Sequence, residues 1–184
     1  ITYSEGKNDA IKIKNEINKF GSTCYCIKMN VTKPSAAFSE IKLLNLNITH
    51  VYYFASPKIK ESRNANIDKI LYKKYLIIYV EAFKNIIKLM CSFYGNNFVL
   101  FYPSTIYATE GSNIFKEYIN AKLKAEKEIS IFNGNAKKDF IYSARLPRLF
   151  TDQNPNLSIK DNNNNLKLFI DEIITFNKIF TKEK

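Results

Sequence analysis

The chain has 184 residues, 46% of them hydrophobic and 14% aromatic, which is typical of one globular domain with a sizeable core. No apolar run reaches the roughly 18 residues of a membrane span and no charged-then-apolar segment opens the chain, so we expect no membrane contact. The net charge of +11 comes from lysines that are dispersed and often adjoin glutamates, as in 124–128. We interpret them as solvated helix faces and expect no nucleic-acid partner.

Alternating strands and helices set the expected fold. Strands are predicted over residues 1–4, 23–29, 49–55, 98–102 and 139–145. Helices are predicted from Asn8 or Asp9 to Gly21, from Ser35, over 67–93, around Tyr118 and Lys122, and over 166–180. This order predicts an α/β fold, a three-layer, doubly wound parallel sheet of the Rossmann type with helices on both faces. No internal repeat or second domain is visible, so residues 1–184 are interpreted as one domain.

Apolar spacing predicts which side chains face the core. Residues 49–55 lack polar alternation, so we expect this strand to be buried on both faces. The helical repeat predicts these inward positions: Ala10, Ile13, Ile17 and Phe20; Phe38, Ile41 and Leu44; Ile70, Tyr75, Ile78, Phe83, Ile86 and Met90. Residues 146–160 and the polar run 162–165 are expected to lie outside the helices.

Cysteine and histidine are scarce. The three cysteines, Cys24, Cys26 and Cys91, are too few for a disulfide framework, and their odd number favours reduced thiols and a cytoplasmic location. The single histidine, His50, precedes an apolar run and is interpreted as a strand-end side chain. We therefore expect no metal site.

The segment from Asn97 to Glu126 carries the candidate chemistry. A buried strand ends near Ser104 and Thr105, and the next helix carries Tyr118 and Lys122. Positions i and i+4 share one helix face, so the lysine ammonium can lie beside the phenol and lower its pKa from near ~10 toward the working range. The chain contains one other Tyr-x-x-x-Lys pair, Tyr3/Lys7. Because the chain is rich in Tyr and Lys, chance alone predicts about two such pairs. Tyr118/Lys122 differs from Tyr3/Lys7 because a predicted strand and two hydroxyl residues precede it.

This arrangement resembles the short-chain dehydrogenase/reductase family, and most of all the ketoreductase domains of polyketide and mixed peptide-polyketide synthases. The resemblance covers nearly the whole chain, and residues 145–153 (Arg-Leu-Pro-Arg-Leu-Phe-Thr-Asp-Gln) look especially like the assembly-line reductases. It implies that Tyr118 donates a proton to the carbonyl oxygen, that Lys122 binds the nicotinamide ribose, and that Ser104 or Thr105 orients the substrate oxygen. We favour Ser104.

The resemblance also implies a cofactor site. Asn30-Val31-Thr32 stands where the family has Asp-Val-Thr beside the adenine, and Ala55 is the residue kept from an Asn-Ala-Gly segment next to the cofactor. Pro147 and Thr151 stand in the loop along the nicotinamide. At the end of the strand 1–4, Ser4 and the nearby Lys7 suit a 2′-phosphate better than a ribose hydroxyl, which favours NADPH.

Two departures from the family pattern stand out. Tyr79 occupies the position where the long helix usually carries an Asn that completes a proton relay. The five glycines form no Gly-rich phosphate turn, which in this fold lies after the first strand. We therefore interpret the chain as the C-terminal portion of a longer reductase domain that lacks its first strand and helix.

The function implied is NADPH-dependent reduction of a ketone to an alcohol. The expected substrate is a β-ketoacyl thioester on an acyl carrier protein or a small ketone, with other domains of a larger synthase as potential partners. One alternative is a non-catalytic, reductase-like domain with a structural or interaction role. A sugar-nucleotide epimerase or dehydratase, which shares the Tyr/Lys pair, ranks lower, because those enzymes carry a longer C-terminal substrate region.

Overall fold

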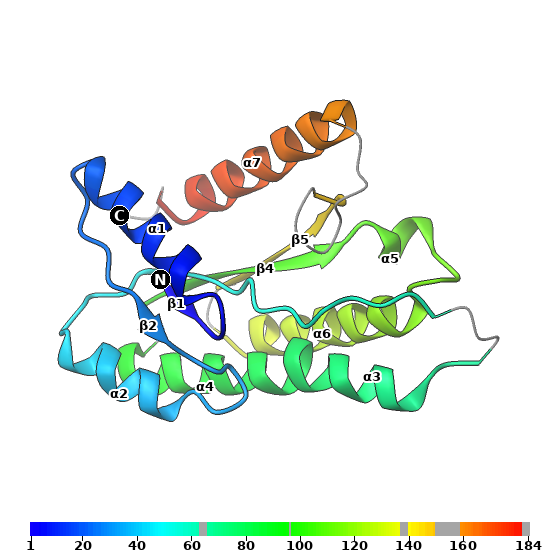
Figure 1. The fold of residues 1–184 in the computed structure, drawn as a ribbon. Coiled ribbons are helices and arrows are strands. Elements are labelled where there is room, and N and C mark those ends of the chain that lie inside the picture. Colours follow the sequence, from blue (N-terminus) through cyan, green and yellow to red (C-terminus); the bar gives the residue numbers. More distant parts are fainter. Residues whose placement is uncertain (63–65, 96, 137–139, 150–158, 182–184) are drawn as a thin grey trace.

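The computed structural model describes residues 1–62, 66–95, 97–136, 140–149 and 159–181, and it confirms the predicted α/β fold (Figure 1). The strands are β1 (Thr2–Tyr3), β2 (Ile27–Lys28), β3 (His50–Tyr52), β4 (Val99–Thr105) and β5 (Ile141–Leu146). The helices are α1 (Lys7–Lys19), α2 (Ser35–Leu43), α3 (Lys69–Leu76), the π-helix η1 (Ile77–Ala82), α4 (Phe83–Tyr94), α5 (Tyr107–Glu110), α6 (Lys116–Gly134) and α7 (Ile159–Thr181).

All strand pairs are parallel, and they form two sheets. β3, β4 and β5 pair in that order, with Val51 opposite Leu100 and Ser104 opposite Arg145. β1 pairs with β2 in a separate two-stranded sheet. Among the described residues no strand ladder joins the two sheets. Because parallel strands end at the same edge, the ends of β3, β4 and β5 converge on one side of the larger sheet.

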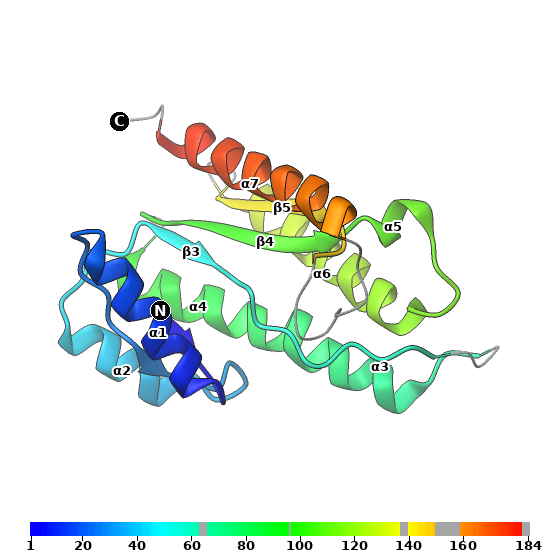
Figure 2. The ribbon, with the colours of Figure 1, turned by 45° about the horizontal axis from the view of Figure 1, so that its top comes forward.

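Two layers of helices cover the larger sheet (Figures 1 and 2). The helix α7 lies on one face, whereas α4 and α6 lie on the other. Side chains of β4 alternate between these layers, as the period of a strand requires. Val99 and Phe101 pack with Phe176 of α7, whereas Leu100 and Tyr102 belong to the larger cluster on the opposite face.

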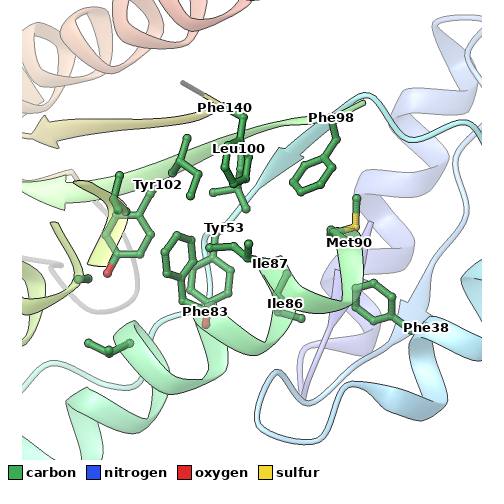
Figure 3. Packing of buried hydrophobic residues seen from close by; sticks show 14 residues of the cluster. Phe38, Tyr53, Phe83, Ile86, Ile87, Met90, Phe98, Leu100, Tyr102 and Phe140 are labelled. Atoms are coloured by element: carbon green, nitrogen blue, oxygen red, sulfur yellow. The ribbon is translucent and has the colours of Figure 1, made fainter. Parts of the chain in front are cut away.

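That larger cluster forms the main core (Figure 3). Phe83 of α4 is fully buried, with its ring centroid 5.2 Å from that of Tyr53 and 4.6 Å from that of Tyr102. Burying an aromatic or aliphatic side chain of this size contributes about 1.5–3 kcal/mol relative to leaving it exposed. Contacts between α4 and the sheet therefore fix the depth at which the helix lies against β4.

The predicted long helix is confirmed, but it contains a wide turn. α3, η1 and α4 follow one another without a break from Lys69 to Tyr94, and Gly95 ends the run with φ 62°. Two carbonyls of the wide turn accept hydrogen bonds from phenols, Ile78 from Tyr53 at 2.7 Å and Tyr79 from Tyr102 at 3.2 Å. Turns of this kind leave carbonyls outside the regular ladder and concentrate at functional sites.

Several predicted burials are wrong. The strand 49–55 is regular only over His50–Tyr52, and Tyr52 and Phe54 are 38% and 51% exposed. Among the described residues its ladder runs to β4 alone, so its other edge has no paired strand. On α1, Ile13 and Phe20 are 49% and 89% exposed, because that helix contacts chiefly β1. Ile70 is 73% exposed.

Element boundaries also differ from the predictions. The strand predicted over 23–29 is regular only at Ile27–Lys28, whereas β4 extends three residues beyond 102 to Thr105. The last helix starts at Ile159, so the polar run 162–165 is helical. Asparagine lowers helix propensity only modestly, and the apolar stripe that follows it extends the helix backward.

Candidate active site

The site lies where β4 ends against α6. Ala121 and Ala125 of α6 are fully buried, and their small side chains let the helix approach η1 and β4 closely. Tyr118, Lys122 and Glu126 follow at four-residue intervals, so they lie along one side of α6. The helix thus presents a phenol, an amine and a carboxylate to the end of β4.

Tyr118 is hydrogen-bonded to the Thr105 side chain and packs edge-on against two other tyrosines. Burial raises the pKa of Tyr118 to about 12, although the Thr105 hydrogen bond acts in the opposite direction. The expected lowering of this pKa by Lys122 is therefore not found. The reason is geometric, because the ammonium lies 5.8 Å from the centroid of the Tyr118 ring and donates its hydrogen bond elsewhere.

Lys122 is only 4% exposed, and its Nζ donates to the Pro103 carbonyl at 2.5 Å. The rings of Tyr79 and Tyr102 lie closer to Nζ than that of Tyr118, at 4.0 and 4.6 Å to their centroids. Burial lowers the pKa of Lys122 to about 7, while the negative charge of Glu126 opposes this change. The amine therefore titrates near neutral pH.

Ser104 points to a different partner from Thr105. Its hydroxyl donates to Glu126 at 2.5 Å, and Arg145 donates to both oxygens of the same carboxylate at 3.0 and 2.7 Å. Burial alone raises the pKa of Glu126, but the hydrogen bonds from Arg145 and Ser104 outweigh it and hold the pKa below its usual range. Arg145 also donates to Thr109, so this network joins α5, α6 and β5.

A pocket of about 410 Å³ opens over these side chains. Its walls include Ser104, Tyr118, Lys122 and Pro147 among the predicted site residues. Ala55 lies between two wall residues, Phe54 and Ser56. The remaining wall residues are Ile59, Glu61, Tyr79, Pro103, Thr105, Tyr107, Phe115, Leu146, Arg148, Leu149 and Phe169.

Three predicted cofactor residues lie outside this pocket. Ser4 follows β1 and is exposed, whereas Asn30 and Val31 follow β2. The Asn30 side chain accepts hydrogen bonds from the backbone and hydroxyl of Thr32, at 2.9 and 2.8 Å. Thr151 lies outside the described residues.

Two acidic residues on α6 have protein partners, although the segment 124–128, which contains one of them, was interpreted as a solvated helix face. Glu126 binds Ser104 and Arg145, and its position four residues after Lys122 is the signal that could have identified it. Glu117 is fully buried and accepts the backbone N–H of Asp68 at 2.8 Å. Its carboxylate thereby fixes the start of α3, and no sequence pattern indicated this long-range contact.

Two kinds of feature are absent from the described part of the chain. None of its helices is both long and apolar enough to span a bilayer. No group of three or more His, Cys, Asp or Glu side chains there could hold a metal ion.

The sequence matches no protein-family model and no curated protein. Solved structures are similar in fold. They include FolM alternative dihydrofolate reductase 1 from Brucella suis in complex with NADP (TM-score 0.66, 12% identity, covering 81% of this chain and 61% of that one). Another is a short chain dehydrogenase from Salmonella enterica serovar Typhi (TM-score 0.70, 8% identity, covering 87% of this chain and 71% of that one). The chain has their fold.

A third similar structure is a 3-oxoacyl (acyl-carrier-protein) reductase from Agrobacterium tumefaciens with NADP bound (TM-score 0.66, 13% identity). The match covers 84% of this chain and 61% of that reductase. The chain thus spans about three-fifths of the Brucella and Agrobacterium reductases. At these identities the likeness concerns the arrangement of strands and helices.

Proposed function

We propose that this chain carries the catalytic and nicotinamide-side part of an NADPH-dependent reductase that converts a ketone to an alcohol. One observation carries the proposal: a partly buried phenol, Tyr118, is hydrogen-bonded to a hydroxyl and has a buried amine 5.8 Å from its ring centroid, in a pocket at the ends of parallel strands. Ligands of open α/β sheets bind outside the carboxyl ends of the strands. Neighbouring structures of this fold contain NADP.

The pocket residues fit the nicotinamide half of the cofactor. Ser56 and Pro147 follow β3 and β5 on either side of the β4 end, and the volume of about 410 Å³ accommodates a ring and a small carbonyl group. Ser4 and the exposed Lys7 follow β1 and offer a hydroxyl and a cation for the 2′-phosphate. The nicotinamide, when bound, supplies the hydride.

Tyr118 then acts as the proton donor. A pKa of about 12 keeps the phenol protonated at neutral pH, so it can deliver its proton as negative charge develops on the carbonyl oxygen. Lys122, 4% exposed, supplies positive charge below its pKa of about 7 and has further N–H groups for a ribose. Phe54, Tyr107 and Phe115 give the pocket an apolar side for the part of the substrate next to the carbonyl.

For the substrate we propose a β-ketoacyl thioester on an acyl carrier protein. The stacked rings of Tyr107 and Phe115, 5.5 Å apart, give the pocket an apolar side suited to an acyl chain. The Agrobacterium neighbour is a 3-oxoacyl (acyl-carrier-protein) reductase, and residues 145–153 resemble assembly-line ketoreductases, which supports a place in a larger synthase.

Cofactor binding tests the proposal directly. Titration of the protein with NADPH, followed by nicotinamide fluorescence, is expected to show saturable binding that is tighter than that of NADH. Lys122→Met is expected to weaken it at least tenfold, which corresponds to ~1.4 kcal/mol, the range of a hydrogen bond from a charged group. The matched control is Lys84→Met, because Lys84 pairs with Glu128 away from the pocket. Equal affinities of both variants and the wild type would exclude this role for Lys122.

The two hydroxyls at the end of β4 can be separated by substitution. Thr105 contacts Tyr118, whereas Ser104 is committed to Glu126, so we propose that Thr105 orients the carbonyl. Thr105→Val is expected to lower kcat about tenfold or more, because the phenol and carbonyl lose a shared partner. Ser104→Ala should instead lower stability by about 1–3 kcal/mol with a smaller change in kcat. Steady-state kinetics and urea unfolding of both variants distinguish this from the reverse assignment.

A second candidate is a non-catalytic, reductase-like domain. The observation that favours it is the enclosure of Lys122 beneath Tyr79 and Tyr102, with a hydrogen bond to the Pro103 carbonyl. An amine that stays in this position serves packing rather than a ribose. NADPH turnover by the wild-type protein, lost in the Tyr118 variant described below, separates the two candidates.

A further inference from the structure

Three tyrosine rings surround the Lys122 ammonium. Nζ lies 4.0 Å from the centroid of Tyr79, 4.6 Å from that of Tyr102 and 5.8 Å from that of Tyr118. These distances fall within the range in which the face of an aromatic ring attracts a cation. Tyr79 and Tyr102 are 1% and 0% exposed, so the attraction acts in a nearly water-free space.

Both ends of Tyr79 are fixed. Its hydroxyl lies 2.7 Å from that of Ser56, whose own proton goes to the Pro57 carbonyl at 3.0 Å, so Tyr79 is the donor in the first bond. Its main-chain carbonyl accepts from the Tyr102 hydroxyl. The ring therefore cannot turn away from Lys122 without breaking the bond to Ser56.

The charged and titratable groups that face Lys122 come from three elements. Tyr118 and Glu126 belong to its own helix α6, Tyr79 comes from η1 and Tyr102 from β4. The Glu126 carboxylate also forms an ion pair with the Arg145 guanidinium, with a nitrogen–oxygen distance of 2.7 Å. Burial acts against the ammonium, whereas the charge of Glu126 and the three ring faces favour it.

We propose that Tyr79 is a positioning residue: its ring face keeps the Lys122 amine charged inside the pocket, and its hydroxyl anchors that ring to Ser56 in the pocket wall. Tyr79 thus takes over, by a different chemistry, the helix position that carries Asn in the reductases the sequence resembles. The use of this ammonium by Tyr118 and a ribose rests on the proposed function. The attraction between ring and amine does not.

The test compares two kinds of Tyr79 substitution. Tyr79→Phe keeps the ring and loses the hydroxyl, whereas Tyr79→Met fills a similar space without an aromatic face. The readout is the pH titration of the Lys122 Cε signal in protein labelled with ¹³C-lysine, identified by its loss in Lys122→Met. We expect the pKa of Lys122 to be unchanged in Tyr79→Phe and to fall by about one unit in Tyr79→Met.

Opposite outcomes overturn the proposal. An unchanged pKa in Tyr79→Met means that the ring contributes nothing to the charge state. A raised pKa means that the ring acts only by excluding water. Tyr79→Leu serves as a second ring-free variant, so a folding defect in Tyr79→Met does not end the test.

Turnover gives an independent reading. The rate of reduction should fall as pH rises through the pKa of Lys122, because the ammonium is lost there. Tyr79→Met should move this limb to lower pH, Tyr79→Phe should leave it in place, and a limb that stays in place in both variants would contradict the role of Tyr79 in catalysis. A wild-type protein without turnover would overturn the proposed function, while the NMR titration would still decide the role of Tyr79.

Discussion

Tyr118→Phe is expected to lower kcat for NADPH-dependent ketone reduction at least about a hundredfold, the usual size of a general-acid effect. The ring and its packing against Tyr75 and Tyr79 are retained, so only the proton donor and the hydrogen bond to Thr105 are lost. The KM for NADPH should change little. The measurement is the decrease of NADPH absorbance with a short β-ketoacyl thioester.

Tyr72→Phe is the matched control for this experiment. Tyr72 is partly buried on α3 at the margin of the same tyrosine cluster and does not line the pocket. Its loss of a hydroxyl should leave kcat within about twofold of the wild-type value, since a substitution away from the reacting atoms has little differential effect on the transition state. Unchanged turnover in Tyr118→Phe would contradict the assignment of Tyr118 as the acid.

Phe83→Ala is expected to destabilise the protein by about 3–5 kcal/mol, a large share of the ~5–15 kcal/mol available to a typical domain. Phe83 is fully buried between Tyr53 and Tyr102, and its removal leaves a cavity against both rings (Figure 3). Because Tyr102 faces Lys122, the variant should also lose NADPH affinity. Urea unfolding followed by circular dichroism measures the first effect.

The chain offers a control of the same chemistry. Phe20→Ala removes an equal ring that is 89% exposed, and we expect a change within about 0.5 kcal/mol. Equal destabilisation by the two substitutions would contradict the core described for α4 and β4. A cooperative transition in the wild type is a precondition for reading either value.

The sequence predicts the alternating order and the pairing of Tyr118 with Lys122 on one helix, because both depend on local spacing. Burial on α1 and β3 was predicted wrongly, since it depends on elements that pack from elsewhere in the fold. Ile13 and Phe20 have the spacing of a buried stripe, yet no described element covers them. Local periodicity reports the side that is apolar, not the presence of a partner for it.

The contacts inside the site depend on three-dimensional details that spacing does not give. Ser104 and Thr105 are adjacent, and their spacing does not indicate that one meets Glu126 and the other Tyr118. The direction in which Nζ of Lys122 turns depends on the Pro103 carbonyl and on rings from two other elements. The departure at Tyr79, visible in the sequence, becomes interpretable only with these neighbours.

The wide turn at Ile77–Ala82 has a consequence for the phase of the helix. Four buried tyrosine, phenylalanine and isoleucine positions, Tyr75, Tyr79, Phe83 and Ile87, follow at four-residue intervals. In a regular α-helix each such step over-rotates by about 40°, so three steps would carry the series about a third of a turn off its face. The π turn holds one extra residue and cancels most of that drift. A single-residue deletion there would let the turn close into regular α-helix with α3 and α4 in their present phase and Tyr75 still toward Tyr118, whereas the same deletion within α4 would rotate everything before it by about 100°.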